Sequence, residues 1–286
     1  MEISNFKDVV ESYDAIFLDA YGVLKNSQGI IPGMQTTIDH LLTSGKPFYI
    51  LTNDASRSPR QMVLRYQEQG LEGIETHHII SSGMMAYAYL KDTVTSGLVA
   101  YLGTKSSADY IKLEHGKMVS IMKVHSSEIS DITAVAFFDD EGFDWQIAVN
   151  KTINILRQLT VPVVVANSDI TYPVAKNEIA LATGGIAAII EQVSGKKFIH
   201  FGKPDGPMFY HAYQLLQDRG LNIPKNKILM VGDTLDTDIL GGNKFGLHTM
   251  LTLSGNTSAR KAAQKIQSKG IIPNYVVESI GMEGNL

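Results

Sequence analysis

The sequence contains no cysteine among its 286 residues. This absence excludes disulfide bonds, thiolate nucleophiles and zinc sites built on cysteine, and it is compatible with a reducing compartment. The opening segment MEISNFKDVVE has no basic stretch followed by an apolar one, and no uninterrupted apolar run approaches the length that spans a bilayer. We therefore expect a cytoplasmic protein that does not engage a membrane.

Long runs of like charge are also absent. The formal net charge is −4, the isoelectric point is near 6.1, and Lys and Arg are scattered. The chain therefore lacks the basic patch that nucleic acid requires, and a small molecule is the partner to expect. The eight histidines show no metal-ligand spacing, and Gly184 and Gly185 lack the context of a dinucleotide fingerprint. Neither zinc nor a dinucleotide cofactor is predicted.

Short apolar runs alternate with amphipathic segments along the chain, which predicts βαβ units and a doubly wound, Rossmann-like parallel sheet. Hydrophobic residues make up 44% of the sequence and charged residues 19%, as in ordinary folded proteins. Between two such flanking pieces lies a stretch with strands and a helix of its own. We expect residues 1–80 and 198–286 to form a core, and residues 81–197 to form an inserted α/β cap domain that selects the substrate. The four runs that matter most for the core sheet are Ala15–Leu18, Pro47–Leu51, Phe198–Phe201 and Lys227–Val231.

Polar side chains follow each of these four runs. Ligands of open parallel sheets bind beyond the carboxyl ends of the strands, so these side chains are expected at one site. Carboxylates, a hydroxyl, an amide and an ammonium suit phosphoryl transfer, and a hard cation such as Mg²⁺ would relieve the repulsion between carboxylates and a phosphate. The residues are Asp19; Thr52 and Asn53; Lys203; and Asp233, with Asp236 and Asp238 close behind.

Four segments resemble the motifs of the haloacid dehalogenase superfamily of phosphohydrolases. They are FLDAYGVL, LTND, GKP and GDTLDTDILGG, and their order and spacing agree with that family. The long insertion between the second and third is similar to the large α/β cap of the class IIA subfamily, which includes sugar-phosphate, nucleotide and aryl phosphatases. The resemblance implies a Mg²⁺-dependent phosphatase. Caps of this kind can contribute to dimers, so a homodimer is the oligomer to expect.

The resemblance assigns the chemistry to three residues. It implies that Asp19 is the nucleophile and forms an aspartyl-phosphate, which divides one hard displacement into two. Thr52 would donate a hydrogen bond to the transferring phosphoryl group. Lys203 would compensate the charge of that group and of Asp19.

The resemblance also implies a set of magnesium ligands. They would be the carboxylates of Asp19 and Asp233 and the backbone carbonyl of Tyr21. Asp238 would support the metal or the lysine from nearby.

Tyr21 departs from the family pattern, because phosphatases of the superfamily usually carry aspartate two residues after the nucleophile. That aspartate is the general acid for the leaving alcohol and then the base for water. A phenol with a pKa near 10 replaces it poorly, and losing general acid–base help costs about 10²–10⁴ in rate. Three interpretations stay open: a slow phosphatase or one for aryl and acyl phosphates, a phosphate-binding protein without turnover, and a metal-free dehalogenase.

Further candidate substrate contacts lie outside the strand ends. Asp54 and Arg57 follow the second motif together with Asn53, and they could touch phosphate or be ordinary solvated loop charges. Asp169 and Tyr172 lie in the insertion, where they could face the substrate or serve turn formation.

Overall fold

The computed structural model describes residues 2–109, 111–175 and 178–283. The chain divides into two compact units. The core unit comprises Met1–Thr52, Pro59–Ile80 and Lys203–Leu286, and the inserted unit comprises Asn53–Ser58 and Ser81–Gly202. Among the described residues, no helix combines the length and the apolar character needed to cross a membrane.

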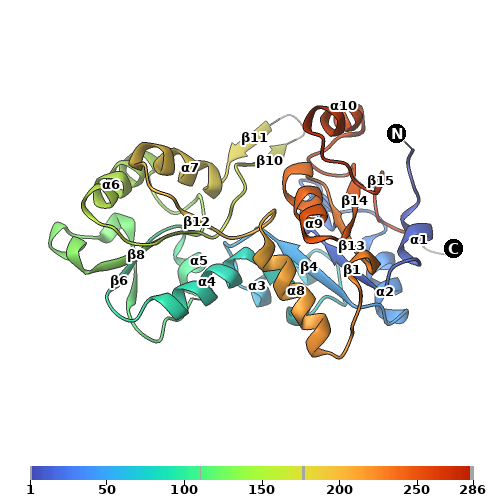
Figure 1. Ribbon diagram of the computed structural model, residues 1–286, viewed down its shortest axis with the longest axis horizontal. Helices are drawn as coiled ribbons and strands as arrows, with labels where there is room; N and C mark the ends of the chain where they lie inside the picture. Colours follow the sequence, from blue (N-terminus) through green and yellow to red (C-terminus); the bar gives the residue numbers. More distant parts are fainter. Residues whose placement is uncertain (1, 110, 176–177, 284–286) are drawn as a thin grey trace. The chain divides into compact units, whose positions relative to one another are not determined.

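A six-stranded sheet with the order β15-β14-β13-β1-β4-β5 organises the core unit (Figure 1). The central strand β1 pairs in parallel with β13 on one side and β4 on the other. All residues of these three strands are buried, which explains why each reads as a continuous apolar run. The strands are β1 (Ala15–Leu18), β4 (Phe48–Thr52), β5 (Ile79–Ser81), β13 (Ile228–Gly232), β14 (His248–Thr252) and β15 (Tyr275–Val277).

Helices cover this sheet with amphipathic faces. In α2 (Met34–Thr43) the buried positions are Met34, Thr37, Ile38 and Leu41, which fall on one helical stripe. The stripe packs in one cluster with Ile16, Leu18 and Ile50 of the sheet. A small antiparallel pair, β2 (Lys25–Asn26) with β3 (Gly29–Ile30), follows β1. The other helices of the unit are α1 (Phe6–Val10), α3 (Pro59–Glu68), α8 (Gly206–Asp218), α9 (Leu240–Phe245) and α10 (Ala259–Lys269).

The inserted unit has a second parallel sheet, with the order β12-β9-β8-β6-β7. Successive residues of its strands alternate between two hydrophobic clusters, as strand geometry requires. Helices α6 and α7 pack on one face and α4 on the other (Figure 1). The elements are α4 (Ser82–Thr93), β6 (Leu98–Leu102), α5 (Lys105–Asp109), β7 (Lys117–Ser120), β8 (Ile132–Phe137), α6 (Trp145–Gln158), β9 (Val163–Val165), β10 (Thr171–Ala175), β11 (Glu178–Leu181), α7 (Thr183–Ser194) and β12 (Ile199–His200).

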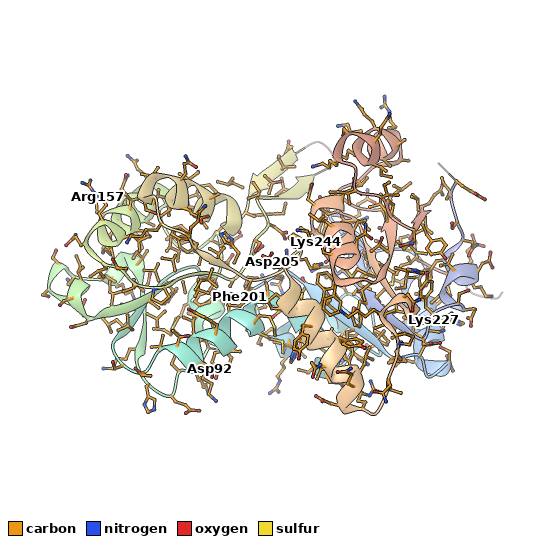
Figure 2. The ribbon with its side chains drawn as sticks, in the orientation of Figure 1. Asp92, Arg157, Phe201, Asp205, Lys227 and Lys244 are labelled. Carbon is orange, nitrogen blue, oxygen red and sulfur yellow. The ribbon has the colours of Figure 1, made fainter. Side chains whose placement is uncertain are left out.

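Three side chains of the inserted unit that Figure 2 labels differ in burial. Phe201, directly after β12, is buried in the cluster that also contains the α4 residues Ala86 and Leu90. Asp92 on α4 and Arg157 on α6 are exposed. The inserted unit therefore has an interior of its own.

The predicted doubly wound α/β architecture is confirmed, but one strand lies in the other sheet. The run Phe198–Phe201 was expected to be a strand of the core sheet, whereas β12 pairs in parallel with β9 of the inserted unit. A short apolar run fits either sheet equally well, and its partner cannot be read from its sequence. The chain re-enters the core unit only at Lys203.

The adjacent histidines His77 and His78 directly precede β5. They end a short 3₁₀ turn, Thr76–His78, with ring centroids 4.0 Å apart. His78 is buried and stacks on Phe48, centroid to centroid at 4.3 Å, and its Nδ1 accepts a hydrogen bond from the Glu75 amide. Burial lowers the pKa of His78 to about 4.

Candidate active site

The predicted acidic residues of the core unit meet at the carboxyl ends of β1 and β13. Asp19 follows β1 and Asp233 follows β13, and the register pairs Leu18 with Val231, so the two strands end within one residue of each other. Asp238 comes from a single π-helical turn, Leu235–Ile239, a rare geometry that is frequent at functional sites. Carboxylate oxygens of Asp19, Asp233 and Asp238 all lie within 4.8 Å of one another.

These three carboxylates are buried, with exposed fractions of 8%, 1% and 1% for Asp19, Asp233 and Asp238. Burial disfavours the ionised form, and each carboxylate repels the others. Burial first, and then Asp238, raise the pKa of Asp233 to about 7. Burial also raises the pKa of Asp19 well above its usual range, against the opposing effect of Lys203.

Lys203 supplies the positive charge among them. Its side chain is 2% exposed, and its ammonium bonds Asp19, lies 2.7 Å from Asp238 Oδ1 and donates to the Leu51 carbonyl at 2.7 Å. Burial alone would lower the pKa of Lys203, but Asp19 and Asp238 outweigh it, so the pKa lies above its ordinary value. The lysine is therefore charged, and it links the segments that carry β1, β4 and the π-helical turn.

The charges of this cluster do not balance. Three carboxylates against one ammonium leave two negative charges in a buried site when all four groups are ionised. A divalent cation would neutralise this excess, and hard cations prefer oxygen ligands of this kind. The residues thus fit a divalent metal held by Asp19, Asp233 and Asp238.

A tight cradle fixes Asp233, and sequence reasoning overlooked it. Asp233 Oδ2 accepts from the Asn256 amide at 2.6 Å, and Oδ1 accepts from Thr234 Oγ1 at 2.7 Å. A Cβ at Gly22 or at Gly255 would lie 2.1 Å or 1.9 Å from Asp233 Oδ2, so only glycine fits at both places. A signal was present, because SGN follows the end of β14 just as polar residues follow the other strands.

Thr52 and Tyr21 complete the predicted core-unit residues. Thr52 is the last residue of β4 and is buried. The Tyr21 phenol hydrogen-bonds Ser27, in the turn between β2 and β3, and burial raises the pKa of Tyr21 further above its ordinary value. The phenol is therefore an even weaker acid–base group at neutral pH than its type suggests.

Asp236 lies apart from the three buried carboxylates. It forms an exposed ion pair with Lys269, with a distance of 2.8 Å between Asp236 Oδ2 and Lys269 Nζ. An exposed pair of this kind contributes little to stability.

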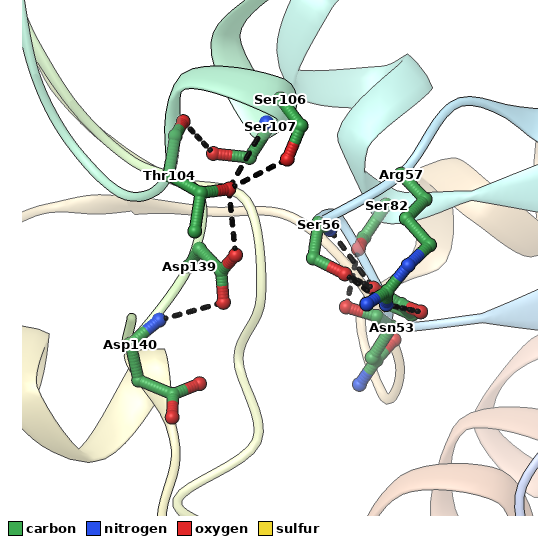
Figure 3. A network of polar contacts seen from close by, with 10 residues as sticks. Asn53, Ser56, Arg57, Ser82, Thr104, Ser106, Ser107, Asp139 and Asp140 are labelled. Carbon is green, nitrogen blue, oxygen red and sulfur yellow. Dashed lines mark hydrogen bonds and ion pairs between the residues drawn. The ribbon is translucent and has the colours of Figure 1, made fainter. Parts of the chain in front are cut away.

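The remaining predicted contacts belong to the inserted unit, and four of them form two pairs. Asn53 Nδ2 donates to Asp169 Oδ1 at 2.9 Å. Asp54 Oδ1 accepts from the Ser56 amide and hydroxyl, and Arg57 lies 3.7 Å from Asp54 Oδ2. Figure 3 labels Ser56, Arg57 and the neighbouring Asn53.

A second polar group lies at the carboxyl ends of β6 and β8. Thr104 Oγ1 donates to Asp139 Oδ2 at 3.1 Å, and Tyr172 donates to Asp140 Oδ2 at 3.1 Å (Figure 3 shows the first of these bonds). Asp139 and Asp140 are only partly buried. Burial, followed by repulsion from nearby acidic residues, raises the pKa of Asp139 to about 6.

Two family models match the chain. One, described as haloacid dehalogenase-like hydrolase, matches residues 16–116, and one described as HAD-hydrolase-like matches residues 200–282. Together they include Asp19, Thr52, Lys203, Asp233 and Asp238. They flank most of the inserted unit.

Known proteins resemble the chain over nearly its whole length. A solved structure of a possible sugar phosphatase of the HAD superfamily from Cytophaga hutchinsonii is 48% identical, with a TM-score of 0.96, and the match covers 99% of this chain and 100% of that one. Chronophin of Mus musculus is 28% identical over 97% of this chain and 95% of its own. The fold is also that of a glycerol phosphate phosphatase from Mycobacterium tuberculosis in complex with magnesium, which is 22% identical with a TM-score of 0.75, covering 98% and 78% of the two chains.

Proposed function

The chain belongs to the haloacid dehalogenase superfamily, class IIA, and on that premise we propose that it is a Mg²⁺-dependent phosphatase of small phosphorylated metabolites, such as sugar or aryl phosphates. The observation that carries the proposal is the buried Lys203 ammonium bonded to Asp19 and Asp238 beside a third carboxylate. This arrangement suits a phosphoryl group, because it combines a nucleophilic carboxylate, a fixed positive charge and ligands for a cation.

Asp19 is the proposed nucleophile. Lys203 stabilises its ionised form in a buried site that otherwise favours the neutral acid. A carboxylate oxygen of Asp19 attacks phosphorus, the bond from phosphorus to the leaving oxygen breaks, and an aspartyl-phosphate forms. Water then attacks that phosphorus and releases inorganic phosphate and the free Asp19 carboxylate.

The other core-unit residues position the phosphoryl group and its charge. The Thr52 hydroxyl donates a hydrogen bond to a phosphoryl oxygen, and the Lys203 ammonium compensates the developing negative charge. Mg²⁺ bound by Asp19, Asp233 and Asp238, with the Tyr21 carbonyl as a further ligand, would neutralise the remaining charge of the phosphate. The Asn256 amide and Thr234 hydroxyl hold Asp233 in place for that purpose.

Tyr21 shapes the choice of substrate. Its phenol is bonded to Ser27 and has a raised pKa, so the leaving oxygen receives little help from a protein acid. Aryl and acyl phosphates need less such help, because their leaving groups are stable as anions. We propose that they react faster than alkyl phosphates, and that the inserted unit selects among substrates.

The test is hydrolysis of p-nitrophenyl phosphate by the purified protein, with Mg²⁺ and with a chelator. We expect turnover that requires Mg²⁺ and that Asp19→Asn reduces by at least about 10⁴-fold while the variant stays folded. Retained activity in the variant would remove Asp19 from its role. Phosphate binding without turnover would favour a binding protein, and metal-independent halide release from a 2-haloacid would favour a dehalogenase.

A further inference from the structure

Asn53 lies at a junction of several chain segments of the inserted unit. It is 4% exposed, and its Nδ2 donates to Asp169 Oδ1 at 2.9 Å. Its backbone carbonyl accepts a hydrogen bond from Ser82 Oγ at 2.9 Å, in a contact that is buried (Figure 3). One residue thus joins the segment after β4, the start of α4 and the loop after β9.

The chain segment that leaves the inserted unit meets the same junction. Gly202, its last residue, has a φ of +116°, and a Cβ there would lie 2.6 Å from Asn53 Oδ1. Nearby, Ser168 Oγ donates to the Phe201 carbonyl at 2.7 Å, so the loop that carries Asp169 also holds the exit segment. The lack of a side chain at Gly202 is what allows Asn53 to occupy its place.

This junction directly adjoins two proposed active-site residues along the chain. Asn53 directly follows Thr52 in the sequence, and Gly202 directly precedes Lys203. In the core unit, the Lys203 ammonium donates to the Leu51 carbonyl, one residue before Thr52. The segments that carry Thr52 and Lys203 are therefore fixed twice, once by Lys203 itself and once by Asn53.

We propose that Asn53 and Asp169 are positioning residues: their hydrogen bond lets the inserted unit set the placement of Thr52 and Lys203. The proposal rests on the proposed function and adds a role for two residues that were expected to contact the substrate. Misplacing reacting groups by about 1 Å can cost about 10²-fold in rate. Loss of this bond should therefore lower kcat, and KM should change little.

Exchanging the two side chains tests the proposal. Asn53→Asp places two carboxylates face to face, which should lower kcat for p-nitrophenyl phosphate by about 10²-fold with less than a threefold change in KM. Asp169→Asn leaves two neutral amides and should cost about tenfold. In the double variant, the amide at position 169 can donate to the carboxylate at position 53. We expect kcat to recover to within about threefold of the Asp169→Asn value or better.

A matched control distinguishes loss of the Asn53–Asp169 bond from a general effect of removing one negative charge. Asp92→Asn makes the same change on the exposed surface of the inserted unit and should leave kcat within about twofold of the starting protein. Gly202→Ala should reproduce the kcat defect of Asn53→Asp, because its methyl group displaces the Asn53 amide. If Gly202→Ala fails to fold, the comparison of Asn53→Asp, Asp169→Asn and the double variant still tests the proposal.

Hydrogen–deuterium exchange gives a readout that does not need catalysis. Amides of residues 50–58 and 198–204 should exchange at least about tenfold faster in Asn53→Asp, and the double variant should restore their protection. The proposal would be overturned if the double variant kept both the fast amide exchange and the low kcat of Asn53→Asp. A rise in KM at constant kcat in the single variants would also overturn it, because that result indicates direct contact with the substrate. Absence of turnover in the unmodified protein would instead refute the proposed function. Hydrogen–deuterium exchange would still test whether the Asn53–Asp169 bond holds the junction together.

Discussion

The two parallel sheets carry different polar side chains at the carboxyl ends of their strands. At the carboxyl ends of the core sheet, three carboxylates are buried around one lysine ammonium. At the carboxyl ends of β6 and β8 in the inserted unit, Asp139 and Asp140 are partly exposed, and they accept hydrogen bonds from the hydroxyls of Thr104 and Tyr172. Parallel topology thus gathers polar side chains in both units, and the charged partner decides how deeply the carboxylates can be buried.

Removing the lysine should have the largest effect on this contrast. Lys203→Met leaves three buried carboxylates without their cation, and breaking such a pair costs about 3–5 kcal/mol of unfolding free energy. We also expect turnover to fall by at least about 10³-fold. Denaturant unfolding with and without Mg²⁺ measures the first effect, and Mg²⁺ should restore part of the stability. Lys244→Met, at an exposed position shown in Figure 2, should change stability by less than about 0.5 kcal/mol.

Adding a fourth carboxylate to the core-unit site should raise its catalytic activity. Tyr21→Asp introduces an acid for the leaving oxygen, so turnover of alkyl phosphates such as glycerol phosphate should rise by about 10²-fold with Mg²⁺ present. The gain for p-nitrophenyl phosphate should be smaller, because its leaving group needs less protonation. Tyr21→Phe, which keeps the backbone carbonyl but adds no acid, should show no gain. A folded, Mg²⁺-binding Tyr21→Asp protein without any gain would contradict the role given to the missing acid.

A buried group that stays neutral should produce a moderate, pH-dependent effect. The pKa of His78 is about 4 in the folded protein and near 6.5 when unfolded, so the unfolded chain binds more protons between these values. Stability is therefore complete above pH 6.5 and falls as the pH drops toward 4. Allowing for partial solvation, the loss should be roughly 1–2 kcal/mol. In His78→Asn, the difference in unfolding free energy between pH 7.5 and pH 4.5 should shrink by that amount; an unchanged difference would remove His78 as the cause.

Weakening the hydroxyl contact in the inserted unit should have the smallest effect. Thr104→Val removes the bond to Asp139 from a partly solvated carboxylate, at a cost of about 0.5–1.5 kcal/mol. Because that bond lowers the pKa of Asp139, the pKa should rise above its present value of about 6. A carboxyl carbon NMR titration of the variant checks the direction. A loss as large as that of Lys203→Met would contradict the contrast between the two sheets.

The sequence predicts local features of the fold well. The expected strand Ala15–Leu18 matches β1, because an apolar run bounded by polar residues fits a buried strand. The runs Pro47–Leu51 and Lys227–Val231 match β4 and β13 to within one residue at each end. Sheet membership is a different matter: β12 pairs with β9, and only three-dimensional packing decides between two available sheets.

The candidate site divides in the same way. Residues directly after strands, such as Asp19 and Asp233, could be placed together because parallel strands end at a common side. Lys203 joins them although it follows a strand of the other sheet, so its inclusion rested on the motif resemblance and on a strand assignment that is wrong. The SGN run after β14 marks a further strand end, but the contact of Gly22 and Gly255 with Asp233 depends on close approach in space and could not be derived from it.

The interrupted path of the chain has a consequence for synthesis. The core sheet places β1 between β4 and β13, so one neighbour of β1 is made more than 200 residues after it. All strands of the β12-β9-β8-β6-β7 sheet, in contrast, lie within one continuous stretch of chain. During synthesis on the ribosome, we therefore expect the β12-β9-β8-β6-β7 sheet to fold first. The core sheet can form only after β13, in the last third of the chain, has been made.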